Sequence, residues 1–60
     1  MDDYDWQINI GYLAEEVTEI HGLETVSFVF SKYGASDFED LNPAKYSEVY
    51  AELLQYSTDY

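Results

Sequence analysis

The clearest structural signal in this chain is the stretch DWQINIGYLAEEVTEIH, residues 5–21, where apolar side chains recur every three or four positions. At about 100° per residue they fall in one narrow stripe, as in an amphipathic helix with one buried face. The stripe consists of Trp6, Ile10, Leu13, Val17 and Ile20. Asp5 is an expected N-cap of this helix, and Asn9 is the alternative cap for a later start. Gly22 predicts its end after His21, with Leu23 folding back as the apolar partner of that ending.

The next segment, from Glu24 to Tyr33, fits two structures. A helix would place Val26, Val29, Phe30 and Tyr33 on one face. A strand is also consistent with the segment, because it is rich in β-branched and aromatic residues that alternate with serines. We favour the helix, because Gly34 is a typical helix stop and the chain offers no convincing partner strand. The alternative is an α+β fold with strands near residues 4–10 and 25–31.

Two helix starts follow Gly34. Ser36 and Glu39 have the spacing of a capping box, which predicts a short helix over residues 37–41. Asn42 then acts as the cap of a last helix, with Pro43 at its first position, where a missing N–H costs nothing. This helix is expected to run to about Tyr56. Its inward stripe consists of Tyr46, Val49, Tyr50 and Leu53.

These elements predict an all-α fold: a small bundle of three main helices and one short connecting helix. The chain forms one domain, residues 1–60, and its ends, including the tail from Ser57, are expected to fray. The expected core consists of Trp6, Leu13, Val17, Val26, Phe30, Phe38, Leu41, Val49 and Leu53.

The segment KYGASDFEDLNP, residues 32–43, and the helix that follows it over residues 46–53 resemble short uncharacterised proteins of bacterial mobile elements. The similarity covers about the last half of the chain. Its matching positions are caps, turns and core residues, so they specify a fold and carry no catalytic signature. The resemblance implies a bacterial, cytoplasmic setting and adds nothing about mechanism.

The charge of the chain excludes several classes of partner. Thirteen carboxylates face only two basic residues, Lys32 and Lys45, and the formal net charge is −11. Nucleic acids and anionic lipids would be repelled, because binding to them depends largely on Lys and Arg. We therefore expect no direct nucleic-acid binding and no membrane binding. A basic protein is the expected kind of partner.

The sequence contains little that could perform chemistry. It has no cysteine, its only histidine is His21, and no serine or threonine lies in a recognised nucleophile motif. The acidic residues fit solvated helix faces and helix caps, and no cluster of them has the ligand spacing of a calcium loop. We expect no enzyme activity, no cofactor and no metal site. The acidic start and the absence of a long apolar run predict a cytoplasmic protein.

Several side chains are candidates for contact with a partner. Ile8 and Tyr12 lie off the stripe of the first helix, beside Glu15 and Glu19, and Phe28 lies off the stripe of the second. They are either buried, because the middle helix is covered on both sides, or exposed as an apolar patch rimmed by acid; we favour burial. The rings expected to make contact are Tyr12 and Tyr56.

The expected function is that of a small acidic protein–protein interaction module, with self-association into a homodimer as one form of it. The alternative is a DNA-mimic inhibitor of a basic nucleic-acid-binding protein. Mimicry requires carboxylates that repeat with phosphate-like spacing along an elongated face.

Overall fold

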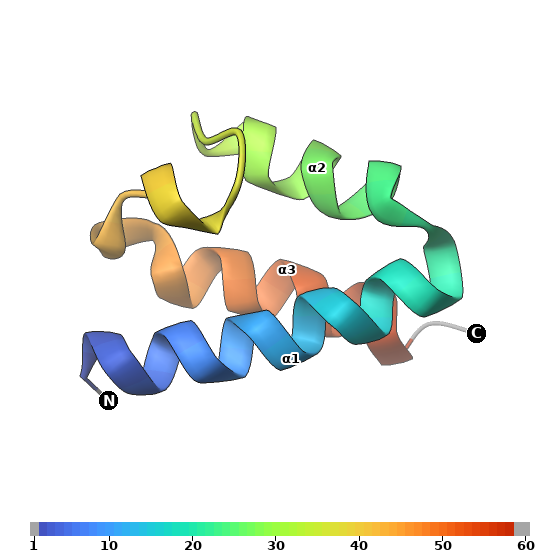
Figure 1. Cartoon of the computed structure of the whole chain (residues 1–60), viewed down its shortest axis with the longest axis horizontal. Helices are drawn as coiled ribbons and strands as arrows, with labels where there is room; N and C mark the ends of the chain where they lie inside the picture. Colours follow the sequence, from blue (N-terminus) through green and yellow to red (C-terminus); the bar gives the residue numbers. More distant parts are fainter. Residues whose placement is uncertain (1, 59–60) are drawn as a thin grey trace.

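The computed structural model describes residues 2–58 and folds them into three α-helices joined by short connections (Figure 1). The elements in chain order are α1 (Asp3–His21), α2 (Leu23–Lys32), the 3₁₀ turns η1 (Phe38–Asp40) and η2 (Pro43–Lys45), and α3 (Tyr46–Thr58). No strand occurs among these residues, so the predicted all-α bundle is confirmed. The alternative with strands near 4–10 and 25–31 is wrong.

Helices α1 and α3 lie side by side and run in the same direction, while α2 runs back across them (Figure 1). With 19 residues, α1 is about 28 Å long. This length matches the longest extent of the molecule, 29 Å. Because one side of α1 packs on the two other helices, its opposite side forms an edge that runs the full length of the bundle.

The ends of α1 differ in part from the prediction. The N-cap is Asp2, whose Oδ1 accepts a hydrogen bond from the Asp5 backbone N–H at 3.0 Å, so the helix begins earlier than expected. Both aspartates are good caps, and the sequence pattern did not distinguish them. Gly22, at φ 97°, ends the helix after His21 as predicted. Leu23 does not fold back: it is the first residue of α2 and is 66% exposed.

Helix α2 ends in a Schellman motif, which stabilises the end of the helix. The backbone N–H of Ala35 donates to the Phe30 carbonyl, and that of Gly34 donates to the Ser31 carbonyl, each at 3.1 Å. Gly34 has the positive φ, 79°, that this motif requires. Ala35 is buried and supplies the apolar contact that accompanies the motif. The predicted stop at Gly34 is confirmed.

The capping box after Gly34 is shifted by one residue from the prediction. Asp37 caps η1 by accepting from the Glu39 N–H at 2.8 Å, and Asp40 rather than Glu39 reaches back. The Asp40 carboxylate accepts from the backbone N–H of Asp37 and of Ser36, and these bonds hold its pKa below the usual value. The run SDFED contains both pairings, and the aspartate pair forms. The expected short helix is a single 3₁₀ turn.

The last helix starts and ends later than predicted. Asn42 is its cap as expected and accepts from the Ala44 N–H at 3.0 Å, but Pro43–Lys45 forms the 3₁₀ turn η2. The α-helix continues past Tyr56. Ser57 is buried and its hydroxyl donates to the Leu54 carbonyl at 2.9 Å, so this residue is part of the helix. The expected fraying of residues 1, 59 and 60 lies outside the described residues.

The core lies where the three helix stripes meet. Its buried apolar members are Ile10, Leu13, Val17, Val26, Val29, Phe30, Ala35, Leu41, Tyr46, Val49 and Leu53. Trp6 and Phe38, also predicted for the core, are half-buried at its margin. Trp6 meets the edge of Tyr50 with ring centroids 5.6 Å apart. Ile20 is 45% exposed, because it lies at the edge of the α1 stripe.

Candidate functional site

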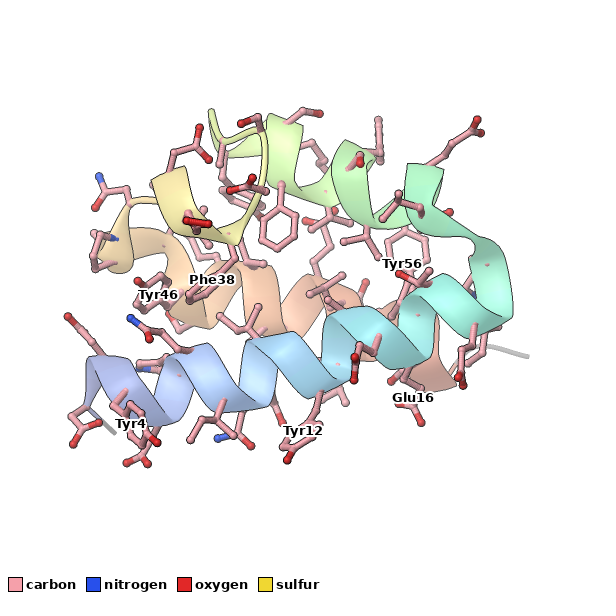
Figure 2. The ribbon with its side chains drawn as sticks, viewed as in Figure 1. Tyr4, Tyr12, Glu16, Phe38, Tyr46 and Tyr56 are labelled. Atoms are coloured by element: carbon pink, nitrogen blue, oxygen red, sulfur yellow. The ribbon has the colours of Figure 1, made fainter. Side chains whose placement is uncertain are left out.

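The full-length edge of α1 carries a row of exposed apolar side chains. Tyr4, Ile8 and Tyr12 are spaced four residues apart and are 68%, 39% and 71% exposed. Figure 2 shows Tyr4 and Tyr12 projecting from the same side of α1, away from α2 and α3. Glu15 and Glu19 continue this row toward the C-terminal end of the helix. We call this surface, made of Tyr4, Ile8, Gly11, Tyr12, Glu15 and Glu19, the α1 outer face.

The expectation that Ile8, Tyr12 and Phe28 are buried is wrong. Burial required a helix covered on both sides, and in a bundle of three helices α1 packs on its neighbours with one side only. Ile8 and Tyr12 therefore form an exposed apolar patch next to acidic residues, which is the alternative to burial.

Two shallow hollows border the α1 outer face, and Glu15 lines both of them. The first is lined by Gln7, Ile8, Gly11, Tyr12 and Glu15. The second, of about 410 Å³, is lined by Ala14, Glu15, Thr18, Glu19, Leu23 and Val26. Because Leu23 is exposed at the start of α2, it extends the apolar lining past the end of α1. An open groove of this kind suits a protein side chain or helix better than an enclosed small molecule.

Gly11 forms the floor of the first hollow. A Cβ added at this position would meet nothing within 4 Å, and only Gly22 and Gly34 among the described glycines have positive φ. Alanine could therefore replace Gly11 without strain. In an exposed helix interior, glycine is less stable than alanine by about 1 kcal/mol. The packing of this chain gives no reason for a glycine here.

Among the described residues, no basic side chain pairs with the acidic groups of the α1 outer face. Both lysines pair with carboxylates of α3: Lys32 with Glu52 at 2.6 Å and Lys45 with Glu48 at 3.3 Å. Within residues 2–58, no ion pair reaches a carboxylate of α1. The exposed carboxylates of this helix are Asp3, Asp5, Glu15, Glu16 and Glu19. They are therefore available to a positively charged partner.

Two other predicted contact residues lie outside this face. Tyr56 is half-buried, and its backbone carbonyl lies 2.9 Å from His21 Nε2. A carbonyl oxygen can only accept, so the imidazole carries a proton on Nε2 and donates it. The two rings meet edge-on at 5.7 Å, and the pair fastens the C-terminal ends of α1 and α3 together. Phe28 is 56% exposed on α2, with Lys32 Nζ 5.4 Å from its ring centroid.

The structure thus brings together Ile8, Tyr12, Glu15 and Glu19, and separates them from Phe28 and Tyr56. Sequence reasoning missed Tyr4 and Gly11. The first could have been found from its position four residues before Ile8, on the same side of the helix. The second could have been found as a glycine in the middle of the strongest helical pattern, where its cost needs a reason.

Away from the α1 outer face, a polar cluster joins α2 to α3. The Glu52 carboxylate accepts from Lys32 Nζ at 2.6 Å and from the Tyr33 hydroxyl at 2.9 Å. The hydrogen bond from Lys32, with a further bond from Tyr33, holds the pKa of Glu52 below its usual value. The hydrogen bonds to Glu52 raise the pKa of Lys32 and of Tyr33. The three groups satisfy one another, so this cluster acts as a clamp between the helices.

The clamp predicts a pH-dependent loss of stability in Glu52→Gln. A lowered carboxylate pKa stabilises the fold above the usual titration range of glutamate, and this contribution disappears as pH falls through the folded pKa. The raised pKa values of Lys32 and Tyr33 stabilise the fold below about pH 10, and that contribution disappears at higher pH. Since the Lys32 side chain is exposed and its charge is screened by solvent, the loss of stability at pH 7 is expected to be small.

Urea unfolding of both proteins from pH 3 to pH 11 measures this effect. The difference in unfolding free energy between wild type and Glu52→Gln is expected to be largest near neutral pH and to shrink at both extremes. Glu48→Gln, which removes the exposed pair with Lys45 at 3.3 Å and leaves the hydrogen bonds of the clamp intact, is the matched control. A difference that stays constant across this range would contradict the role given to the clamp.

Within residues 2–58, no group of three or more histidine, aspartate or glutamate side chains is placed to hold a metal ion. None of the helices in this part of the chain is both long and apolar enough to cross a membrane. The chain matches no protein-family model, and no curated protein or solved structure is significantly similar to it.

Proposed function

We propose that this protein is an acidic protein–protein interaction module that binds its partner through the α1 outer face and has no catalytic activity of its own. The observation that carries the proposal is the row of Tyr4, Ile8 and Tyr12, exposed along one side of α1. Tyrosine is enriched in binding surfaces, because it buries a large apolar ring with little loss of rotamer freedom.

The charge around this row supports a basic partner. The net charge is −11, and the carboxylates of α1 have no lysine partner within residues 2–58. Acidic groups beside an apolar row would attract a positively charged surface and fix its register once it docks. The apolar row would then supply most of the binding energy.

A DNA mimic is less well supported by the same helix. Between Asp5 and Glu15, α1 carries no carboxylate over about 15 Å. A mimic of duplex DNA needs negative charges far more closely spaced than this along one face. The tyrosine and isoleucine side chains occupy the length where those charges would be required.

We place this activity in the bacterial cytoplasm. The support for this setting is the resemblance of residues 32–53 to short proteins of bacterial mobile elements. The absence of a membrane-spanning helix among the described residues is compatible with it.

The double variant Ile8→Ala/Tyr12→Ala tests the proposed surface. Partners captured from a native lysate by the wild-type protein are expected to bind this variant roughly tenfold more weakly or worse, because buried aromatic anchors dominate interface energies. The matched control is Phe28→Ala/Leu54→Ala, which also removes two exposed apolar side chains but outside α1. Quantitative mass spectrometry of the three captures measures the difference. Equal retention of the same proteins by both variants would contradict the proposal.

A further inference from the structure

Gly11 lowers the stability of α1, and the fold of this chain does not explain why a glycine is present there. It lies in the middle of the longest helix, its backbone does not need glycine, and a Cβ would meet nothing within 4 Å. The residue lines the hollow between Ile8 and Tyr12. A missing side chain at this point lets another chain approach the helix backbone more closely than any other residue would allow.

The side chains around Gly11 have the arrangement that a second helix requires. Tyr4, Ile8 and Tyr12 form a row at four-residue spacing, which is one of the ridges that pack into the grooves of a neighbouring helix. The distance between two packed helices is set by the side chains at their crossing point. A glycine beside this ridge therefore marks the place of closest approach.

The charges of the α1 outer face determine which residues a partner helix needs. The N-terminal part of the α1 outer face is apolar, and its C-terminal part presents Glu15 and Glu19, which no described lysine balances. Glu19 lies about 10 Å along the helix from Tyr12. A matching helix needs apolar residues opposite Ile8 and Tyr12 and lysine or arginine opposite the glutamates.

A second copy of this chain does not meet that requirement. Its α1 outer face carries the same glutamates and no lysine or arginine, and each copy has a net charge of −11. Two such faces would repel each other, because like charges in an interface are unfavourable.

On the basis of the proposed function, we infer that the occupant of the α1 outer face is a basic amphipathic helix of a partner protein, and that it crosses α1 over Gly11. The glycine permits the close approach, the row of Tyr4, Ile8 and Tyr12 supplies the apolar contact, and Glu15 and Glu19 orient the basic residues of the partner.

The probe for this inference is a fluorescent helical peptide of about 18 residues, long enough to match α1, with leucines three and four residues apart and lysines elsewhere. Fluorescence anisotropy measures its binding to the full chain at about 0.1 M salt, where screening reduces non-specific attraction. Gly11→Gln is expected to weaken binding roughly tenfold, because the new side chain fills the floor of the hollow. It is also expected to raise the melting temperature by about 3 °C, because it removes a helical glycine.

Ser27→Gln, on the exposed side of α2, is the matched control and is expected to leave binding unchanged. A peptide with glutamate in place of lysine, and one with two central prolines, are expected not to bind. If the peptide bound Gly11→Gln as tightly as the wild type, or if the proline peptide bound as tightly as the helical one, the inference would be overturned. The proposed surface is tested separately, by the Ile8→Ala/Tyr12→Ala variant. No binding to the wild type would also overturn the inference. A wild-type dimer in sedimentation that Gly11→Gln abolishes would instead identify a second copy as the occupant.

Discussion

Leu53→Ala is expected to unfold most of the protein at 37 °C. The Leu53 side chain is completely buried in the core, on α3, which packs mainly against α1. Replacing a buried leucine by alanine costs about 2–5 kcal/mol, which includes the cavity it leaves. A domain of this size without disulfides rarely has more than about 3–5 kcal/mol of stability to lose.

Thermal unfolding followed by circular dichroism measures this effect. Leu54→Ala is the neighbouring control, because Leu54 is 41% exposed and surface substitutions usually change stability by less than about 0.5 kcal/mol. If both variants melted at the wild-type temperature, the core assigned to α3 would be incorrect.

Gly22→Ala is expected to destabilise the protein by about 1–3 kcal/mol. Gly22 is the single residue between α1 and α2, and its φ of 97° and ψ of 161° lie in a region that is almost exclusive to glycine. An added Cβ would meet no atom within 4 Å, so the cost arises from the backbone conformation and not from a clash. The chain has no other residue in this connection that could absorb the change.

The same substitution at another glycine provides the contrast. Gly11→Ala is expected to stabilise the protein, because Gly11 has an ordinary helical backbone. Melting temperatures of the two variants, measured side by side, should therefore move in opposite directions. A rise in both would show that residue 22 adopts a different conformation in solution.

The helix pattern of this fold was predictable from the sequence, whereas several ends were not. The stripe from Ile10 to Val17 predicted α1 because its period is unambiguous over several turns. Its start was misplaced, because Asp2 and Asp5 are equally good caps and only the backbone geometry distinguishes them. The capping box was misplaced for the same reason, since the run SDFED contains two overlapping boxes.

The candidate site was predictable only in part. The helical wheel correctly separated Ile8 and Tyr12 from the core stripe, but it could not say whether another element covers them. That depends on how many neighbours α1 has, which is a property of the whole bundle. The position of Tyr56 against His21 was also hidden, because it involves a backbone carbonyl and not the tyrosine hydroxyl.

The edge-on contact between Trp6 and Tyr50 gives the molecule a built-in optical reporter. Trp6 is the only indole of the chain, and it faces α3 from the side of α1 opposite Tyr4 and Ile8. Its emission will shift to longer wavelength when α1 separates from α3 and water reaches the ring. A ligand seated on the far side of α1 leaves the surroundings of this ring unchanged, so one spectrum distinguishes unfolding from occupancy.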